Sequence, residues 1–340
     1  MVFYVGTYTR LGGPGVAVCA LEDGAMRLVE TAPLPNPTYL ILSPDRTRLY
    51  AVSSDPAGAG SRGGSCAIYD VRSDGLALRH RFDTGGEGPC HLCPSPDGRF
   101  LYVANYTSGH LTVFPLDPPG PRIQVIAHEG ASVHPQRQSG PHIHHVSFLP
   151  GTRTLAAVDL GIDAVVLYRQ DPATGLLSES GRMPCRPGLG PRHIAYGDPG
   201  TAYLVHELGN AVSVLRTGAD TMTCVQTLST LPEGFRGDNT GAAIRVFGGH
   251  VFASNRGHDS IAVFAVGRDG LLSPAGVFAT GGAIPRDFIL LPDGRMLVAH
   301  QGGTVSLLQW EPEAPALTPC APPLPIPGAV CVCPALPRRA

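Results

Sequence analysis

Short apolar runs separated by turn-forming residues recur along the whole chain. A first run is followed by a turn containing proline, aspartate or glycine and then by a second run, as between Gly88 and Ala104. Such turns between short apolar runs are typical of β-hairpins. The turns are Ser43-Pro44-Asp45, Ser95-Pro96-Asp97-Gly98, Leu149-Pro150-Gly151, Asp198-Pro199-Gly200, Phe247-Gly248-Gly249 and Leu291-Pro292-Asp293-Gly294. A third run and, in most copies, a weaker fourth run follow. None keeps a helical period, so we expect four strands per unit and no helix.

The unit recurs about every 48 residues, a spacing typical of repeat architectures. The residues that open the first strand of successive units are Thr38, Cys90, His144, Arg192, Ala242 and Arg286. One further step reaches Pro327-Gly328, and a strand-like run, Ala329 to Val332, comes next. The remaining strands of this last unit stand at the N-terminus, at Phe3–Thr7, Gly15–Leu21 and Met26–Glu30. The chain is therefore expected to close on itself.

Seven four-stranded units of about 48 residues, joined by a split unit, predict an all-β, seven-bladed β-propeller. We expect one domain over residues 1–340, with a C-terminal strand at 328–334 completing the N-terminal blade. The proline-rich stretch at 311–327 is interpreted as an extended arm that delivers this strand, and a disordered tail is the alternative.

Composition narrows the possible partners. The chain has 25 basic and 27 acidic residues and 43% hydrophobic residues, without a basic stripe, so nucleic acid is not an expected partner. No apolar stretch is long enough to span a membrane, and the N-terminus reads as a strand rather than a signal peptide. Nine cysteines without framework spacing favour a reduced, cytoplasmic protein. Every basic side chain is arginine, which excludes lysine Schiff-base chemistry and leaves arginine to bind anions.

Two registers of the repeat carry polar side chains toward one end of the predicted propeller. The first is the opening of the first strand, which holds His144, Arg192 and Arg286. The second is the end of the second strand, with the pairs Thr7-Tyr8, Ser53-Ser54, Asn105-Tyr106, Asp159-Leu160, His206-Glu207, Asn255-Arg256 and His300-Gln301. We expect these side chains to converge on one mouth. The alternatives are solvated polar residues and an ion pair between units without chemistry.

Histidine, glutamate and arginine together suit hydrolysis of an ester or lactone. A carboxylate or an imidazole can activate water, and arginines can bind an anion and stabilise an oxyanion. Neither Cys90-His91-Leu92-Cys93 nor the histidines at 142, 144 and 145 near Asp159 favours a metal site strongly. We therefore expect neither a metal nor another cofactor.

Five segments resemble the seven-bladed propeller lactonase family, which includes cycloisomerase-type bacterial 6-phosphogluconolactonases and a fungal carboxy-muconate cyclase. They are Gly6-Thr7-Tyr8-Thr9, Ala104-Asn105-Tyr106, Gly190-Pro191-Arg192-His193, Pro285-Arg286-Asp287-Phe288 and the run from Ser254 to Phe264, which begins Ser-Asn-Arg-Gly-His-Asp-Ser-Ile. The likeness extends from Tyr4 to about Pro334, and the run from Ser254 is its most specific part.

The resemblance implies metal-independent hydrolysis of 6-phosphogluconolactone to 6-phosphogluconate in the pentose phosphate pathway. It places the catalytic cluster on His144, Arg192, Glu207 and Arg256, with either Glu207 or His144 as the general base. We expect His142, Arg286, Asn105 and His206 to contribute to binding of a small anionic lactone. The alternatives are a lactonase or cycloisomerase for another carboxylated lactone, such as a muconolactone, a calcium-dependent lactonase, and a non-catalytic binding propeller.

Overall fold

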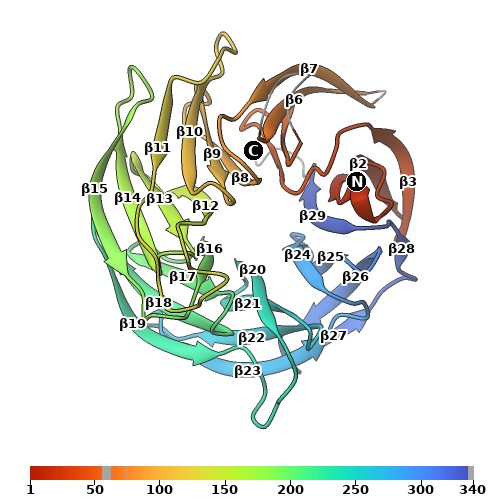
Figure 1. The fold of residues 1–340 in the computed structure, drawn as a ribbon. Coiled ribbons are helices and arrows are strands. Elements are labelled where there is room, and N and C mark those ends of the chain that lie inside the picture. Colours follow the sequence, from red (N-terminus) through yellow and green to blue (C-terminus); the bar gives the residue numbers. More distant parts are fainter. Residues whose placement is uncertain (56–62, 74, 336–340) are drawn as a thin grey trace.

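Seven antiparallel sheets surround one axis in the computed structural model, which describes residues 1–55, 63–73 and 75–335 (Figure 1). From the innermost strand outward, blade 1 contains β29 (Ala329–Pro334), β1 (Val2–Thr7), β2 (Val16–Glu22) and β3 (Ala25–Ala32); blade 2, β4 (Leu40–Leu42), β5 (Arg48–Ser53), β6 (Ser65–Arg72) and β7 (Gly75–Asp83); blade 3, β8 (Pro89–Pro94), β9 (Phe100–Asn105), β10 (His110–Pro115) and β11 (Gln124–Ala127); blade 4, β12 (Ile143–Phe148), β13 (Thr154–Asp159), β14 (Ala164–Gln170) and β15 (Leu177–Pro184).

The other three sheets continue the same order. Blade 5 contains β16 (Pro191–Tyr196), β17 (Thr201–His206), β18 (Ala211–Thr217) and β19 (Met222–Ser229); blade 6, β20 (Thr240–Phe247), β21 (His250–Arg256), β22 (Ser260–Val266) and β23 (Leu272–Ala279); blade 7, β24 (Pro285–Leu290), β25 (Arg295–His300), β26 (Thr304–Glu311) and β27 (Ala316–Pro319), with β28 (Leu324–Pro325) also paired to β26. The innermost strands contact one another in a closed cycle, β4, β8, β12, β16, β20, β24 and β29. The predicted seven-bladed propeller is confirmed.

The two ends of the chain meet in blade 1. β29 pairs antiparallel with β1, so that Tyr4 lies opposite Cys333 and Val5 opposite Val332. The expected closure of the ring is thus confirmed. The proline-rich stretch at 311–327 contains β27 and β28 before the chain reaches β29. Residues 336–340 of the expected domain lie outside the described part.

Helix is confined, among the described residues, to one turn of 3₁₀ helix, η1 (Thr9–Leu11), between β1 and β2. The sequence predicted no helix, because one turn is too short to show a period. No helix in the described part of the chain has the length and apolar character needed to cross a membrane.

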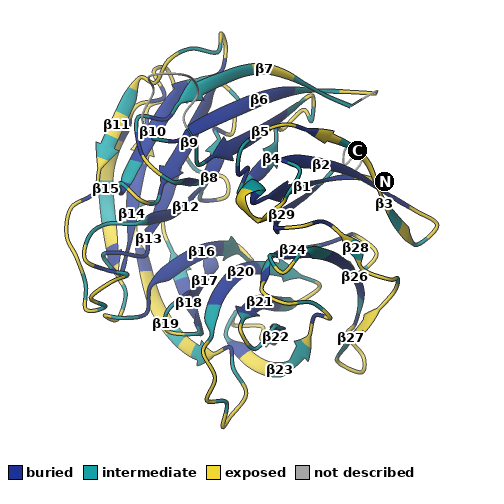
Figure 2. Ribbon diagram, turned by 45° about the vertical axis from the view of Figure 1, so that its right-hand side comes forward, coloured by how far each residue is buried: buried dark blue, intermediate teal, exposed yellow. Residues whose placement is uncertain are grey.

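The hydrophobic core lies between the blades. Strands β9, β13 and β17 are buried along their whole length, because each blade packs against a neighbour on both faces (Figure 2). The buried apolar residues form seven clusters, and each cluster draws its members from two neighbouring blades. Outer strands such as β19 are mostly exposed or half-buried, as expected for a sheet edge facing solvent.

A β-bulge recurs near the start of the inner strands. The pairing of inner with second strand skips Cys90 in β8, His144 in β12, Arg192 in β16 and Arg286 in β24. In β20 the skipped residues are Ala242 and Ala243, and in β29 Val330. An unpaired bulge residue re-aims its side chain and bends the strand. The first repeat register identified in the sequence thus coincides with the bulges, except for Thr38, which precedes β4.

Candidate active site

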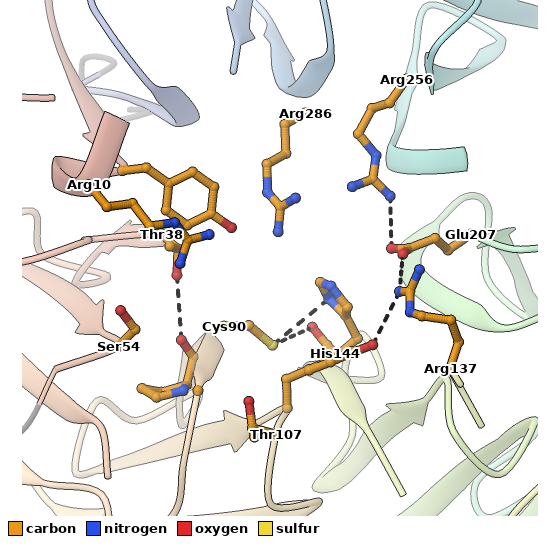
Figure 3. A pocket seen from close by; sticks show the side chains of 14 residues that line it. Arg10, Thr38, Ser54, Cys90, Thr107, Arg137, His144, Glu207, Arg256 and Arg286 are labelled. Atoms are coloured by element: carbon orange, nitrogen blue, oxygen red, sulfur yellow. Dashed lines mark hydrogen bonds and ion pairs between the residues drawn. The ribbon is translucent and has the colours of Figure 1, made fainter. Parts of the chain in front are cut away.

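A pocket of about 440 Å³ opens at the axis and gathers residues from all seven blades and the connections between them (Figure 3). It is lined by Tyr8, Arg10, Thr38, Ser54, Gly88, Pro89, Cys90, Tyr106, Thr107, Arg137, His144, Glu207, Arg256 and Arg286. Four of these side chains are arginines and one is a carboxylate. A pocket with this surplus of positive charge favours an anionic ligand the size of a sugar.

The carboxylate of Glu207 is held by three arginines. Arg192 Nε donates to Glu207 Oε2 over 2.8 Å, Arg256 Nη2 approaches the same oxygen at 2.9 Å, and Arg137 Nη2 donates to Oε1. Glu207 and Arg192 are buried, whereas the Arg256 and Arg137 side chains are partly exposed. Glu207 and Arg256 form the ion pair between units that the sequence offered as the alternative to chemistry, and both residues line the pocket.

These contacts fix the charges of the cluster. The guanidinium groups of Arg256 and Arg192 outweigh the effect of burial and hold the pKa of Glu207 well below its usual range. Burial, with Arg256 nearby, lowers the pKa of Arg192 to about 9, so this arginine is still charged at neutral pH. Glu207 is therefore a permanent anion and a weak base.

His144 presents an imidazole to the same pocket from the bulge in β12. Burial and the charge of Arg192 keep the pKa of His144 well below its usual value, so the ring is neutral at neutral pH. Cys90 Sγ lies 3.9 Å from His144 Nδ1 and within 3.5 Å of the Ile143 and His144 carbonyl oxygens. In the tautomer with the proton on Nδ1, the thiol donates to a carbonyl and its sulfur accepts from Nδ1–H, which leaves the lone pair on Nε2. His144 Nε2 hydrogen-bonds to no described residue.

Cys90 itself is a poor nucleophile. Burial raises the pKa of its thiol to about 12, despite the nearby charges of Arg192 and Arg286. Because only the thiolate is strongly nucleophilic, this thiol is unsuited to attack a substrate, and its contacts are with the ring and backbone of His144 and the Ile143 carbonyl.

The residue pairs of the second repeat register, at the ends of the second strands, are divided between the pocket and the interior of the blades. The second members Tyr8, Ser54, Tyr106, Glu207 and Arg256 line the pocket. The first members are buried and hydrogen-bond within their own blades or to the connections between blades. Thus Asn105 Nδ2 donates to the His110 carbonyl and to Thr112 Oγ1, and His206 Nε2 lies 2.7 Å from Ser213 Oγ.

The residues expected from the sequence therefore separate into three groups. His144, Glu207, Arg256 and Arg286 line the pocket, and Arg192 lies behind Glu207, where it also donates to the Ala242 carbonyl. His142 stands behind Tyr106, with ring centroids 4.5 Å apart and Nδ1 2.8 Å from the Tyr106 carbonyl oxygen. Asn105 and His206 do not line the pocket, and their contacts are those of blade structure.

Two pocket arginines were missed at the level of sequence. Arg137 lies in the connection between β11 and β12 and also donates to the Tyr106 hydroxyl, and Arg10 lies in η1. Both stand in connections that have no counterpart in the other units, so comparing repeats could not find them. Their only signal is the general need for arginine at an anion site.

The histidines do not assemble into a metal site. Within residues 1–55, 63–73 and 75–335, no three or more His, Cys, Asp or Glu side chains are arranged to hold a metal ion. His145 packs instead against His91, with ring centroids 4.0 Å apart, and against His193 at 5.0 Å.

The fold and the pocket together define a seven-bladed β-propeller with an arginine-rich site on its axis. A family model described as "Lactonase, 7-bladed beta-propeller" matches residues 2–334. The chain belongs to this lactonase family.

Individual relatives agree with this assignment. The chain is 36% identical to a 6-phosphogluconolactonase of Bacillus subtilis over 344 residues, covering 97% of each protein. Its structure is similar to that of the periplasmic gluconolactonase of Pseudomonas aeruginosa, with a TM-score of 0.90, 30% identity and coverage of 97% and 98% of the two chains. A protein from Lactobacillus plantarum gives a TM-score of 0.90 at 28% identity, covering 98% of this chain and 99% of that one.

Proposed function

We propose that the protein hydrolyses 6-phosphogluconolactone to 6-phosphogluconate without a metal ion. The observation that carries this proposal is the pocket, which is lined by four arginines, one carboxylate and a neutral imidazole. The similarity to a 6-phosphogluconolactonase over nearly the full length of both chains supports it.

The geometry favours His144 over Glu207 as the general base. Both oxygens of Glu207 accept hydrogen bonds from arginine, whereas His144 Nε2 is without a partner among the described residues. In the proposed reaction, Nε2 takes a proton from water while the water oxygen attacks the lactone carbonyl. Glu207 stabilises the resulting imidazolium, since its charge favours protonation of His144.

The arginines would stabilise the charge that develops on the substrate. Arg256 Nη1 has no hydrogen-bond partner in the described part of the chain, and it can donate to the tetrahedral oxyanion. When the intermediate collapses, the carbon–ring oxygen bond breaks. The departing alkoxide takes the proton from the His144 imidazolium, which regenerates the neutral base and leaves the acid product.

A second candidate is hydrolysis of an unphosphorylated sugar lactone. The similarity to a periplasmic gluconolactonase at a TM-score of 0.90 favours it. The same reacting groups would serve both substrates, so the two candidates differ only in whether the pocket binds a phosphate.

For the cellular setting we propose the cytoplasm and the oxidative use of sugar phosphates. The nine cysteines, all within the described residues, are free thiols, which suits a reducing compartment. Fractionation of the native organism tests this, and recovery of the protein with periplasmic or secreted markers would contradict it.

A lactone panel with and without EDTA tests the proposed reaction. We expect hydrolysis of 6-phosphogluconolactone to persist in EDTA and to fall by roughly 10²–10⁴ in His144→Gln, the range typical of general-base removal. Arg256→Ala should lower kcat by at least about tenfold through the lost oxyanion donor. Arg268→Gln is the matched control, since Arg268 is exposed and does not line the pocket. Full activity in both pocket variants would refute the mechanism.

A further inference from the structure

Two guanidinium groups that line the pocket are paired with no carboxylate of the described residues. Arg10 and Arg286 make no side-chain hydrogen bond or ion pair with any residue that the structure describes, although both line the pocket. This contrasts with Arg137, Arg192 and Arg256, which are all paired with Glu207.

Both free guanidinium groups pack on one aromatic ring. The Arg10 guanidinium carbon lies 4.1 Å from the centroid of the Tyr8 ring, and that of Arg286 lies 5.5 Å from the same centroid. Stacking on an aromatic face partly compensates the repulsion between two like charges and leaves their N–H groups available. Figure 3 shows Arg10 across the pocket from Glu207, with Arg286 pointing into the pocket between Arg10 and Arg256.

The backbone that carries Arg10 is anchored. The backbone N–H of Arg10 donates to Asn36 Oδ1 over 3.3 Å, and the backbone N–H of Asn36 donates to Thr9 Oγ1 over 3.2 Å. Tyr8 is buried, and its N–H donates to the Gly328 carbonyl at 2.8 Å. The platform is therefore fixed by blade 1 and the segment that precedes β4. The hydroxyl-bearing residues Thr38 and Ser54 line the pocket as well.

We propose that Arg10 and Arg286, on the Tyr8 platform, form a subsite for a phosphate monoester carried at the far end of the lactone. This inference rests on the proposed function and specifies the substrate class of the same pocket. Tyr8, Arg10 and Arg286 come from blades 1 and 7, whereas His144, Glu207 and Arg256 come from blades 4 to 6. A ligand that reaches both groups spans the axis with its carbonyl at one side and its anionic group at the other.

The chemistry of the two sides fits such a molecule. Two arginines can each offer a pair of N–H donors to phosphate oxygens, and two free positive charges match a phosphate dianion. The Glu207 side is less suited to a second anion, because the carboxylate already uses donors from three arginines.

Substrate preference provides the test. We measure kcat/KM for 6-phosphogluconolactone and for unphosphorylated gluconolactone in the wild type, Arg10→Gln and Arg10→Lys, with Arg268→Gln as a charge-matched control. Arg10→Gln should lower the ratio of the two kcat/KM values by about tenfold or more, the loss expected for a charged hydrogen bond. Arg10→Lys should restore part of this ratio, and Arg268→Gln should leave the ratio at its wild-type value. Since Arg10 is exposed, the variant is expected to fold, and its melting temperature checks this.

Calorimetry separates failure of the subsite from failure of the proposed reaction. Inorganic phosphate and 6-phosphogluconate should bind the wild type more tightly than gluconate does, and Arg10→Gln should lose this preference. Suppose that no lactone is hydrolysed, but the wild type prefers the phosphorylated ligands and Arg10→Gln loses this preference. The proposed phosphate subsite is then supported and the proposed reaction is refuted. If both lactones are hydrolysed and Arg10→Gln keeps the wild-type ratio and phosphate affinity, the subsite is overturned.

Discussion

At the scale of single residues, Glu207 pairs with three arginines, and the proposed mechanism gives it no role as the base. Its carboxylate accepts from the buried Arg192 and is also paired with Arg256 and Arg137, so it compensates charges that would otherwise be uncompensated. Removing one partner of a buried ion pair typically costs about 3–5 kcal/mol, because the other charge loses its compensation. Loss of activity in a Glu207 variant would consequently not identify Glu207 as the base.

A pH profile distinguishes His144 from an ordinary imidazole. Burial and Arg192 lower its pKa well below 6.5, and a base must be unprotonated to accept a proton. We therefore expect kcat/KM to stay constant as the pH falls from 8 through 6.5 and to decline only at more acidic pH. Uncharged gluconolactone is the appropriate substrate, because a phosphate would titrate in this range. A half-maximal loss near pH 6.5 would contradict the assignment.

At the scale of elements, β-bulges and the alternation of side chains along a strand determine which polar residues face the pocket. The bulges in β12 and β24 release His144 and Arg286 from the pairing register. At the ends of the second strands, neighbours such as His206 and Glu207 divide between blade and pocket. A sequence repeat shows that such residues share a register but not which one faces the axis. For that reason Asn105 and His206 could not be separated from Tyr106 and Glu207 in advance.

The ring closure was predictable because each apolar run has counterparts in the other units. The first blade lacks its inner strand near the N-terminus, and the run from Ala329 supplies it. Arg10 and Arg137 lie in connections without counterparts, where loop geometry decides their position. The fold and the candidate site residues His144, Glu207, Arg256 and Arg286, which line the pocket, could thus be predicted from periodicity and resemblance. The positions of Arg10 and Arg137 in the connecting loops could be found only from the structure.

Truncation tests the role of β29. Ending the chain after Pro327 removes the buried Val330, Cys331 and Val332 and leaves β1 as an unpaired inner strand. Each buried aliphatic side chain contributes about 1.5–3 kcal/mol, so the loss is comparable to the stability of a typical domain. We expect no cooperative unfolding transition by circular dichroism. An equal melting temperature for the truncated and the full-length chain would disprove the role of β29 in closing the ring.

At the scale of the whole molecule, the interior holds an unusual number of neutral histidines. His91, His145 and His193 are in mutual ring contact on the inner strands, and Tyr39 packs on His91 at 3.9 Å. Burial is the main cause of a lowered pKa for all three. Burial likewise lowers the pKa of His206 and of His300 to about 4.

These histidines should make the propeller acid-sensitive. In the unfolded chain each titrates near 6.5, so below this pH the unfolded state binds more protons and stability falls as the pH is lowered toward about 4. Urea unfolding between pH 7.5 and 5 should show an uptake of several protons. His206→Asn with His300→Asn should reduce the uptake by about two, since Asn105 and Asn255 hold this register in other blades. Stability that is constant over this range would contradict the prediction.

A crystal structure with 6-phosphogluconate would show whether these residues, far apart in sequence, meet around one anionic molecule. We expect the carboxylate between His144 and Arg256, where the carbonyl would react, and the phosphate on Arg10 and Arg286. A product molecule that binds away from this pocket, or that lies in it with its two ends reversed, would refute the proposed site.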